Sequence, residues 1–191
     1  MKSSYVFLAP GFEEVEALTP VDVLRRAGMD VKTVSVTSSR DVEGAHGVTI
    51  KADMTFDESD CNDCDWLILP GGMPGATNLY DFKPLCSLLL KHNAEGGRIA
   101  AICAAPAVVL GELGLLDGKE ATCYPGFESV APQAMFQPRR VVVSDNIVTA
   151  NGPSSALVFA LTIVAEAKGD NEAKQVGEGM LFYDKHLNYY L

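Results

Sequence analysis

The chain has 191 residues, of which 48% are hydrophobic, and a formal net charge of −10 at pH 7. This length and composition fit one globular domain with a substantial core. The acidic balance argues against nucleic acid or an anionic membrane as a partner, because both are bound by clusters of Lys and Arg.

The N-terminal segment and the cysteines favour a cytoplasmic protein. Residues 1–17 read MKSSYVFLAPGFEEVEA, which is too poor in apolar residues and too acidic for a secretory signal peptide. No apolar run approaches the roughly 18 residues that a membrane helix needs. Five cysteines at irregular spacing do not suggest a disulfide framework. We therefore expect a soluble protein of a reducing compartment.

Apolar runs alternate with helical patterns along the chain, which favours a parallel sheet covered by helices. The strands are predicted, in chain order, at residues 4–9, 31–36, 65–69, 98–102, 141–143 and 147–150. The helices are predicted at residues 19–28, 83–95, 104–110, 153–168 and 171–181. No repeat or linker interrupts this order, so residues 1–191 are expected to form a single α/β domain.

Two local patterns refine this prediction. The segment TPVDVLRRAG has Thr19 as a suitable N-cap, Pro20 at the first helical position and Gly28 as a stop. Residues 42–53 carry two glycines between short β-type pieces, which is typical of a small hairpin.

Three predicted strands end in turns whose side chains suit chemistry. These turns are APGFEEVEA at residues 9–17, LPGGMPGA at residues 69–76, and the junction at Cys103. Ligands of open parallel sheets bind at the carboxyl ends of strands, near the point where the strand order reverses. This edge of the sheet is therefore the predicted site.

Cys103 follows a strand directly and opens a helix, within GGRIAAICAAPAVVLGEL. This is the layout of a nucleophile elbow, in which small neighbours, here Ala101 and Ala105, permit a strained turn. Exposed N–H groups and the positive end of the helix favour a thiolate, so the thiol pKa is expected to be lowered. A small apolar core residue explains the local pattern equally well.

The glycine-rich turn LPGGMPG is a second candidate part of the site at the carboxyl ends of the strands. The turn at Gly71 and Gly72 exposes backbone N–H groups and could supply one donor of an oxyanion hole, with the N–H of Ala104 as the other. An ordinary tight turn is the alternative.

Four segments in register resemble the ThiJ/PfpI superfamily: AICAAP, LPGGMPGATNL, GFEEVEALTPVDVLRRAG and NGPSSALVFALTIVAEAKG. The likeness is greatest with the branch of the parkinsonism-associated protein deglycase and its bacterial relatives. It implies a flavodoxin-like sandwich, with a mostly parallel sheet between helices on both faces, and a homodimer. It also implies that Cys103 is the oxidisable nucleophile, that Glu16 hydrogen-bonds its sulfur, and that Gly72 and Ala104 supply backbone donors beside it.

A thiolate and a carboxylate in contact repel, so Glu16 and Cys103 are not both expected to be charged. We expect Glu16 to keep its proton and the pair to titrate as a unit. The alternative for Glu16 is a solvated acid in the first turn of a helix, like its neighbours Glu13 and Glu14.

One departure from the family concerns Tyr124, which stands in EATCYPGFES where the family often has a histidine. A phenol with a pKa near ~10 is a poor base at neutral pH, although it can donate a hydrogen bond. Protease chemistry through a Cys–His pair is therefore not supported. Of the remaining histidines, His46 falls in the hairpin, His92 in a helix and His186 in the tail, and a partner chain could supply one.

The other cysteines have weaker interpretations. Cys61 and Cys64 form a C-x-x-C in the acidic loop DESDCNDCD, without the following helix of a redox motif or a second pair of zinc ligands. An incidental solvated loop is favoured. Cys123 is a candidate resolving thiol for Cys103, and Cys86 is expected to pack in an apolar helix face. The tail MLFYDKHLNYYL is expected to pack on the core, with a dimer or partner surface as the alternative.

These observations leave two functions open. In the first, Cys103 adds to a reactive carbonyl such as an α-oxoaldehyde, as in a glyoxalase or deglycase, with no cofactor or metal. In the second, the protein is a redox sensor or stress chaperone in which a peroxide oxidises Cys103 to the sulfinate. Protease and thiamine-biosynthesis roles, which are also found in the family, are less favoured.

Overall fold

A seven-stranded sheet forms the centre of the computed structural model, which describes residues 2–182, and its strand order is β10-β11-β7-β6-β1-β2-β5. The strands are β1 Ser3–Leu8, β2 Val31–Ser35, β5 Met54–Thr55, β6 Cys64–Leu69, β7 Arg98–Ile102, β10 Val141–Ser144 and β11 Ile147–Ala150. All neighbouring strands are parallel except β10, which pairs antiparallel with β11. The mostly parallel sheet is therefore confirmed.

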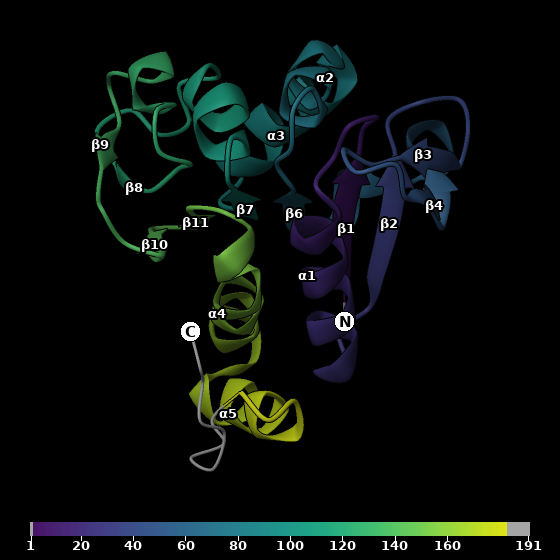
Figure 1. Cartoon of the computed structure of the whole chain (residues 1–191), viewed down its shortest axis with the longest axis vertical. Helices are drawn as coiled ribbons and strands as arrows, with labels where there is room; N and C mark the ends of the chain where they lie inside the picture. The colour runs from purple at the N-terminus through teal and green to yellow at the C-terminus, as the bar shows by residue number, and fades with distance from the viewer. Residues whose placement is uncertain (1, 183–191) are drawn as a thin grey trace.

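Helices cover both faces of this sheet (Figure 1). They are α1 Glu14–Arg26, α2 Gly75–Asp81, α3 Lys83–Ala94, α4 Ala156–Lys168 and α5 Asp170–Gly179. From β1 and β6 the chain crosses in opposite directions along the sheet, to β2 and to β7. Because such crossovers are right-handed, α1 and α3 lie on opposite faces, and a topological switch point falls between β1 and β6.

The core fills both interfaces between the sheet and the helices. Its largest fully buried side chains include Phe7 on β1, Trp66 on β6 and Phe159 on α4. The predicted hairpin is confirmed by β3 Asp41–Glu43 pairing antiparallel with β4 Thr49–Lys51 at the β2 edge of the fold (Figure 1). A further short pair joins β8 Glu120–Ala121 to β9 Met135–Phe136.

The first helix begins earlier than the sequence predicted. Glu13 is the N-cap, and its carboxylate accepts a hydrogen bond of 2.7 Å from the backbone N–H of Glu16. This cap starts α1 before Thr19, so Pro20 lies inside the helix rather than at its first position. The earlier start places Glu16 in the first turn of α1, beside the carboxyl ends of the strands.

Two other helices differ from the prediction. The segment after Cys103 forms a wide π-helical turn at Pro106–Gly111. The short helix α2 was not predicted, because the glycines and prolines of LPGGMPG obscure its start.

Two further expectations concern membrane helices and the aromatic tail. Across residues 2–182, no helix has the length and apolarity that a membrane crossing requires. Most of the aromatic tail, from residue 183 onward, lies outside the described residues.

Candidate active site

Three strand ends meet at Cys103, beside the switch point between β1 and β6. Glu16 lies in the first turn of α1, which follows β1, Gly71 in the turn after β6, and Cys103 directly after β7. The backbone N–H of Gly71 donates to Oε2 of Glu16 at 2.9 Å. Its carbonyl accepts a bond of 3.0 Å from the N–H of Glu13. The chain thus brings together residues that are 87 positions apart, from 16 to 103.

Gly71 is the close-packed centre of this arrangement. A Cβ atom at Gly71 would lie 2.6 Å from the Cβ of Cys103 and 2.7 Å from Oε2 of Glu16. Real Cβ atoms do not approach other atoms so closely, because the overlap is strongly repulsive. Only glycine therefore allows the carboxyl and the thiol to share this space.

The backbone of Cys103 has the strained geometry of a nucleophile elbow. Its φ is +67°, in the left-handed region that a side chain with a Cβ disfavours. Two hydrogen bonds hold it there: Cys103 N–H donates to the carbonyl of Ala150 at 2.9 Å, and Tyr124 N–H donates to the carbonyl of Cys103 at 2.8 Å. Strain of this kind persists where the surrounding structure over-determines it, typically at functional sites.

The carboxyl of Glu16 is fully buried, and burial is the largest cause that raises its pKa, to about 7. Its hydrogen bond with Cys103 lowers this pKa, the charge of Glu13 raises it, and the N–H of Gly71 lowers it. Glu16 is therefore not a solvated acid. Its other oxygen, Oε1, is buried without a hydrogen-bond partner among the described residues.

The thiol of Cys103 behaves differently from the prediction. Burial, followed by the charge and the hydrogen bond of Glu16, raises its pKa to about 12. The backbone N–H groups of Gly72 and Ala104 bond the sulfur and lower this pKa, but they do not outweigh burial. The expectation of a lowered thiol pKa is wrong, because it counted the donors and omitted desolvation. Because the thiol pKa is about 12, the pair of Glu16 and Cys103 still holds one proton at neutral pH.

Gly72 is held in place as firmly as Gly71. Its φ is +86°, and a Cβ there would lie 2.5 Å from both the N of Glu13 and the carbonyl of Gly11. The N–H of Gly72 and the N–H of Ala104 both bond the sulfur of Cys103. Two N–H groups converging on one sulfur can also hold an oxygen bonded next to it.

Tyr124 and Cys123 lie in the segment that hydrogen-bonds to the elbow. The phenol ring of Tyr124 is 45% exposed and packs edge-on against Phe127, with ring centroids 6.3 Å apart. Cys123 is buried, and burial raises its pKa to about 12. The backbone of Tyr124 thus fixes Cys103, while its side chain remains open to solvent.

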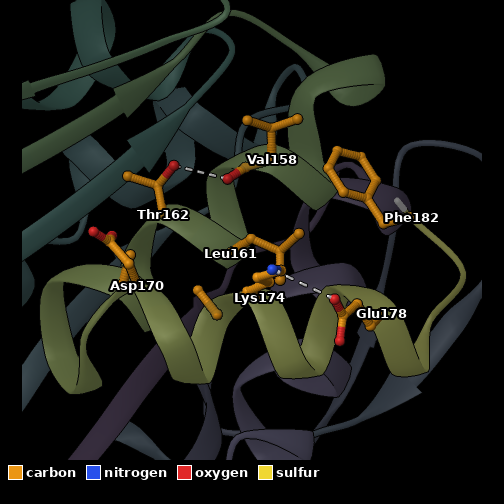
Figure 2. A pocket seen from close by; sticks show the side chains of 9 residues that line it. Val158, Leu161, Thr162, Asp170, Lys174, Glu178 and Phe182 are labelled. Atoms are coloured by element: carbon orange, nitrogen blue, oxygen red, sulfur yellow. Dashed lines mark hydrogen bonds and ion pairs between the residues drawn. The ribbon is translucent and has the colours of Figure 1, made fainter. Parts of the chain in front are cut away.

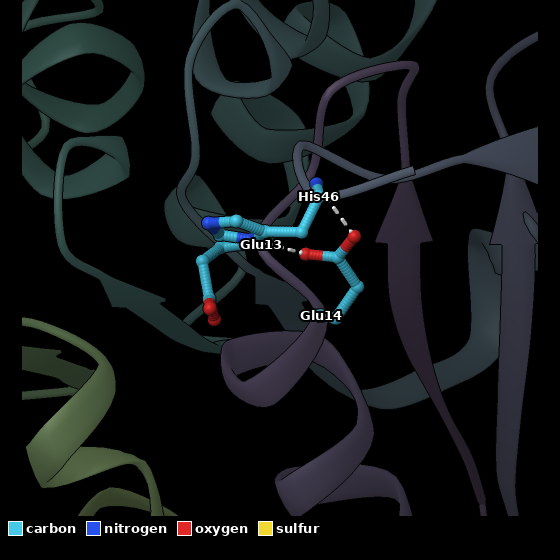
Figure 3. Close-up of side chains that lie close together, drawn as sticks. All are labelled: Glu13, Glu14 and His46. Carbon is cyan, nitrogen blue, oxygen red and sulfur yellow. Dashed lines mark hydrogen bonds and ion pairs between the residues drawn. The ribbon is translucent and has the colours of Figure 1, made fainter. Parts of the chain in front are cut away.

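The two histidines among residues 2–182 have partners other than Cys103. His46 in the hairpin points toward Glu14, with its Nδ1 2.7 Å from a carboxylate oxygen (Figure 3). The N–H of His46 donates to the other oxygen at 2.8 Å. Glu13, Glu14 and His46 are close enough to hold a metal ion, but Glu13 caps α1 and Glu14 is bonded to the hairpin. This cluster therefore serves to fasten the hairpin to α1.

A groove of about 620 Å³ lies elsewhere, between α4 and α5 (Figure 2). It is lined by Val158, Leu161, Thr162, Ala165, Asp170, Ala173, Lys174, Glu178 and Phe182. None of these residues belongs to the surroundings of Cys103. The chemistry of the carboxyl–thiol pair, rather than the size of a cavity, identifies the candidate site.

The fold and the elbow define an α/β sandwich protein with a buried carboxyl–cysteine pair at its switch point. Residues 2–166 match the DJ-1/PfpI family. The chain belongs to this family, which confirms the resemblance seen in the sequence.

Relatives support this membership. The protein is similar to "Protein DJ-1 homolog B" of Arabidopsis thaliana, with 39% identity over 92% of this chain and 40% of the relative, so it spans less than half the length of that protein. It is similar to "Glutathione-independent glyoxalase DJR-1.2" of Caenorhabditis elegans, with 32% identity over 92% and 94% of the two chains. The solved structure of oxidised Toxoplasma gondii DJ-1 superposes with a TM-score of 0.91 at 41% identity, covering 95% and 98%.

The tight contacts of Gly71 generate a prediction. Gly71→Ala is expected to separate Glu16 from Cys103 and to lower the free energy of unfolding by about 1–3 kcal/mol, the usual cost of overpacking. Urea denaturation measures the stability. Gly179→Ala is the matched control, because a Cβ there meets nothing within 4 Å. Equal midpoints for Gly71→Ala and the wild type would contradict the geometry.

Proposed function

We propose that this protein is a cofactor-independent enzyme that uses Cys103 to convert reactive carbonyls, in the manner of a glyoxalase or deglycase. The observation that carries the proposal is the buried Glu16 carboxyl, with a pKa of about 7, hydrogen-bonded to a cysteine on a strained elbow. A base with a pKa near the working pH is the most effective for proton transfer. The relative that bears the name of a glutathione-independent glyoxalase supports this choice of chemistry.

The first step joins Cys103 to the substrate. As the sulfur attacks the aldehyde carbon of an α-oxoaldehyde, the thiol proton passes to the Glu16 carboxylate and a C–S bond forms. The aldehyde oxygen takes up the electron pair of its π bond, and the N–H groups of Gly72 and Ala104 stabilise that charge. The high pKa of the thiol is therefore no obstacle to the attack, because the thiol proton passes to Glu16 while the C–S bond forms and no free thiolate is needed.

The second step moves a proton within the bound substrate. Glu16 returns its proton to the oxygen, giving a hemithioacetal, and its carboxylate then takes the proton from the former aldehyde carbon. Delivery of this proton to the neighbouring carbon, together with transfer of the hydroxyl proton of the hemithioacetal to the neighbouring oxygen, gives a thioester of a 2-hydroxy acid. Water cleaves the thioester and restores the thiol. The sum is the addition of one water molecule, so neither a redox cofactor nor a metal ion takes part.

A specific observation favours a redox role as the second candidate. Oε1 of Glu16 is buried with no hydrogen-bond partner among residues 2–182, on a carboxyl that contacts Cys103. A protonated carboxyl there can donate to an oxygen added to Cys103, and such charge-assisted bonds are the strong ones. The second candidate is a cytoplasmic stress sensor or chaperone in which a peroxide oxidises Cys103 to the sulfinate.

The enzyme is proposed to work as a homodimer, with two copies joined through α1 and the hairpin. Val15 and Leu18 on α1 and Val48 beside the hairpin are exposed apolar side chains, at 51%, 37% and 48%. The bonds between Glu14 and His46 hold these two elements together, so the apolar side chains belong to one surface. Closed twofold pairing is the commonest way to bury such a surface.

The dimer proposal predicts a mass near twice the 20.4 kDa of the chain in light scattering. Val15→Asp is expected to lower the mass toward that of the monomer, because it places a charge in the interface. Val143→Asp, at an exposed position on the opposite edge strand, is the control. A monomer mass for the wild type across micromolar dilution would rule the dimer out.

The enzyme proposal is tested by turnover of methylglyoxal to lactate. Cys103→Ala is expected to abolish turnover, and Glu16→Gln to lower kcat roughly 100-fold or more, the scale of a lost general base. Tyr124→Phe should cost at most a few-fold, the scale of one hydrogen bond of ~1 kcal/mol. Cys86→Ala is the matched cysteine control. Turnover that survives Cys103→Ala would exclude the mechanism, and a 100-fold loss in Tyr124→Phe would make Tyr124 central.

The redox candidate is tested by intact mass spectrometry after graded peroxide treatment. Wild type and Glu16→Gln are expected to gain about 32 Da, the mass of two oxygens, because both can donate to the sulfinate. Glu16→Leu lacks a donor, so its oxidation should stop at sulfenate or pass to a disulfide with Cys123. Equal sulfinate yields in the wild type and Glu16→Leu would disprove the stabilising role of Glu16.

A further inference from the structure

Two cysteines and a histidine lie together at the opposite end of β6 from the candidate active site. Cys61 opens a single 3-10 turn, Cys61–Asp63, and Cys64 is the first residue of β6. His92 lies in the last turn of α3. From Cys64 to the carboxyl end of β6 the strand runs about 17 Å, at ~3.3 Å per residue. This cluster is therefore separate from Cys103.

The structure corrects the prediction that Cys61 and Cys64 occupy a solvated loop. Cys61 is 5% exposed, Cys64 7% and His92 7%. The sequence suggested only two possible zinc ligands here, because His92 stands 28 residues beyond Cys64. In the folded chain α3 brings His92 next to Cys64 on β6, so a histidine joins the two cysteines as a possible ligand.

The imidazole of His92 is oriented as in metal-binding histidines. Its Nε2 lies 3.2 Å from the carbonyl oxygen of Arg98, and a carbonyl can only accept, so Nε2 carries the proton. The lone pair of Nδ1 then accepts a hydrogen bond from the thiol of Cys64, and a metal ion would take the place of that thiol proton. Histidines that bind metals usually donate their other N–H to a carbonyl or carboxylate in this way.

The spacing of the two donor atoms also fits zinc. Sγ of Cys64 and Nδ1 of His92 are 3.7 Å apart. In tetrahedral zinc sites the Zn–S and Zn–N bonds of about 2.3 and 2.1 Å place sulfur and nitrogen about 3.6 Å apart. An ion between these two atoms therefore needs almost no movement of either side chain.

Cys61 completes the set after a rotation of its side chain. Its thiol now donates to the hydroxyl of Ser59 at 3.1 Å. The turn that begins at Cys61 leads directly into Cys64 at the start of β6, and a rotation about the Cα–Cβ bond of Cys61 turns its sulfur toward Cys64. The C-x2-C spacing is typical of zinc ligands. Cys61 and His92 also line one small cavity, together with Leu88, Lys91 and Glu95.

We propose that Cys61, Cys64 and His92 bind a zinc ion, with the fourth position taken by the Glu95 carboxylate or by water. On binding, the two thiols release their protons to solvent and coordinate as thiolates, so no oxidant or reductant is required. Of the acidic side chains nearby, Asp63 pairs with Lys2 and Asp65 with Arg98, so the two thiolates supply the charge that balances the ion. The bound ion fastens the 3-10 turn to α3, which is a structural role independent of carbonyl turnover.

The test is differential alkylation of the full chain with iodoacetamide, after chelation and again with one equivalent of Zn²⁺. Peptide mass mapping is expected to show Cys61 and Cys64 labelled at least roughly 10-fold more slowly with zinc, while Cys103 and Cys86 are unchanged. Protection of Cys103 alone, or of no cysteine, would overturn the proposal. This readout requires no variant, so a misfolded mutant cannot obscure it.

Variants then identify the ligands. With Co²⁺ in place of zinc, the wild type is expected to give the sulfur-to-cobalt absorption of a two-thiolate tetrahedral site. Cys64→Ser and His92→Gln should weaken binding roughly 10–100-fold or more, whereas Cys86→Ser should not. Zinc should raise the Tm of the wild type but not of Cys64→Ser. Unchanged cobalt spectra in Cys64→Ser would contradict the assignment.

Discussion

The hydrogen bond between the buried carboxyl of Glu16 and the thiol of Cys103 is the interaction on which the rest of the site depends. It exists because Gly71 has no side chain, and because the elbow at Cys103 accepts a left-handed backbone. Burial raises the pKa of both groups, so neither ionises as it would in water. Proton transfer between the two, rather than a preformed thiolate, is what this geometry supports.

The topology of the sheet explains why this pair can form. Crossovers diverge from β1 and β6 at the carboxyl ends of these strands, which is where ligand sites of open parallel sheets form, and Glu16 and Gly71 both lie there. The N-cap bond from Glu13 adds to this arrangement, since it starts α1 early enough to aim Glu16 inward. The negative charge of the Glu13 carboxylate also raises the pKa of Glu16. Fold, helix start and electrostatics thus act on one side chain.

Much of the fold and part of the site could be predicted from the sequence. Apolar runs fixed the main strands, and the position of Cys103 between a strand and a helix indicated the elbow. The start of α1 could not be predicted, because Glu13 is an uncommon N-cap compared with Thr19. The raised thiol pKa and the burial of Cys61 and Cys64 depend on residues distant in sequence. Local patterns carry no information about such desolvation, nor about His92 beside Cys64.

The central claim is that Glu16 is a base whose pKa is raised by burial, and held at about 7 by the opposing effect of its hydrogen bond with Cys103. The most direct measurement is a titration of the Glu16 carboxyl carbon by NMR, with the Glu16→Gln spectrum for assignment. The account predicts a midpoint at about 7. In Cys103→Ala the midpoint should rise, because the bond that lowers the pKa is lost. A midpoint near ~4.3, the ordinary value of a solvated glutamate, would contradict it.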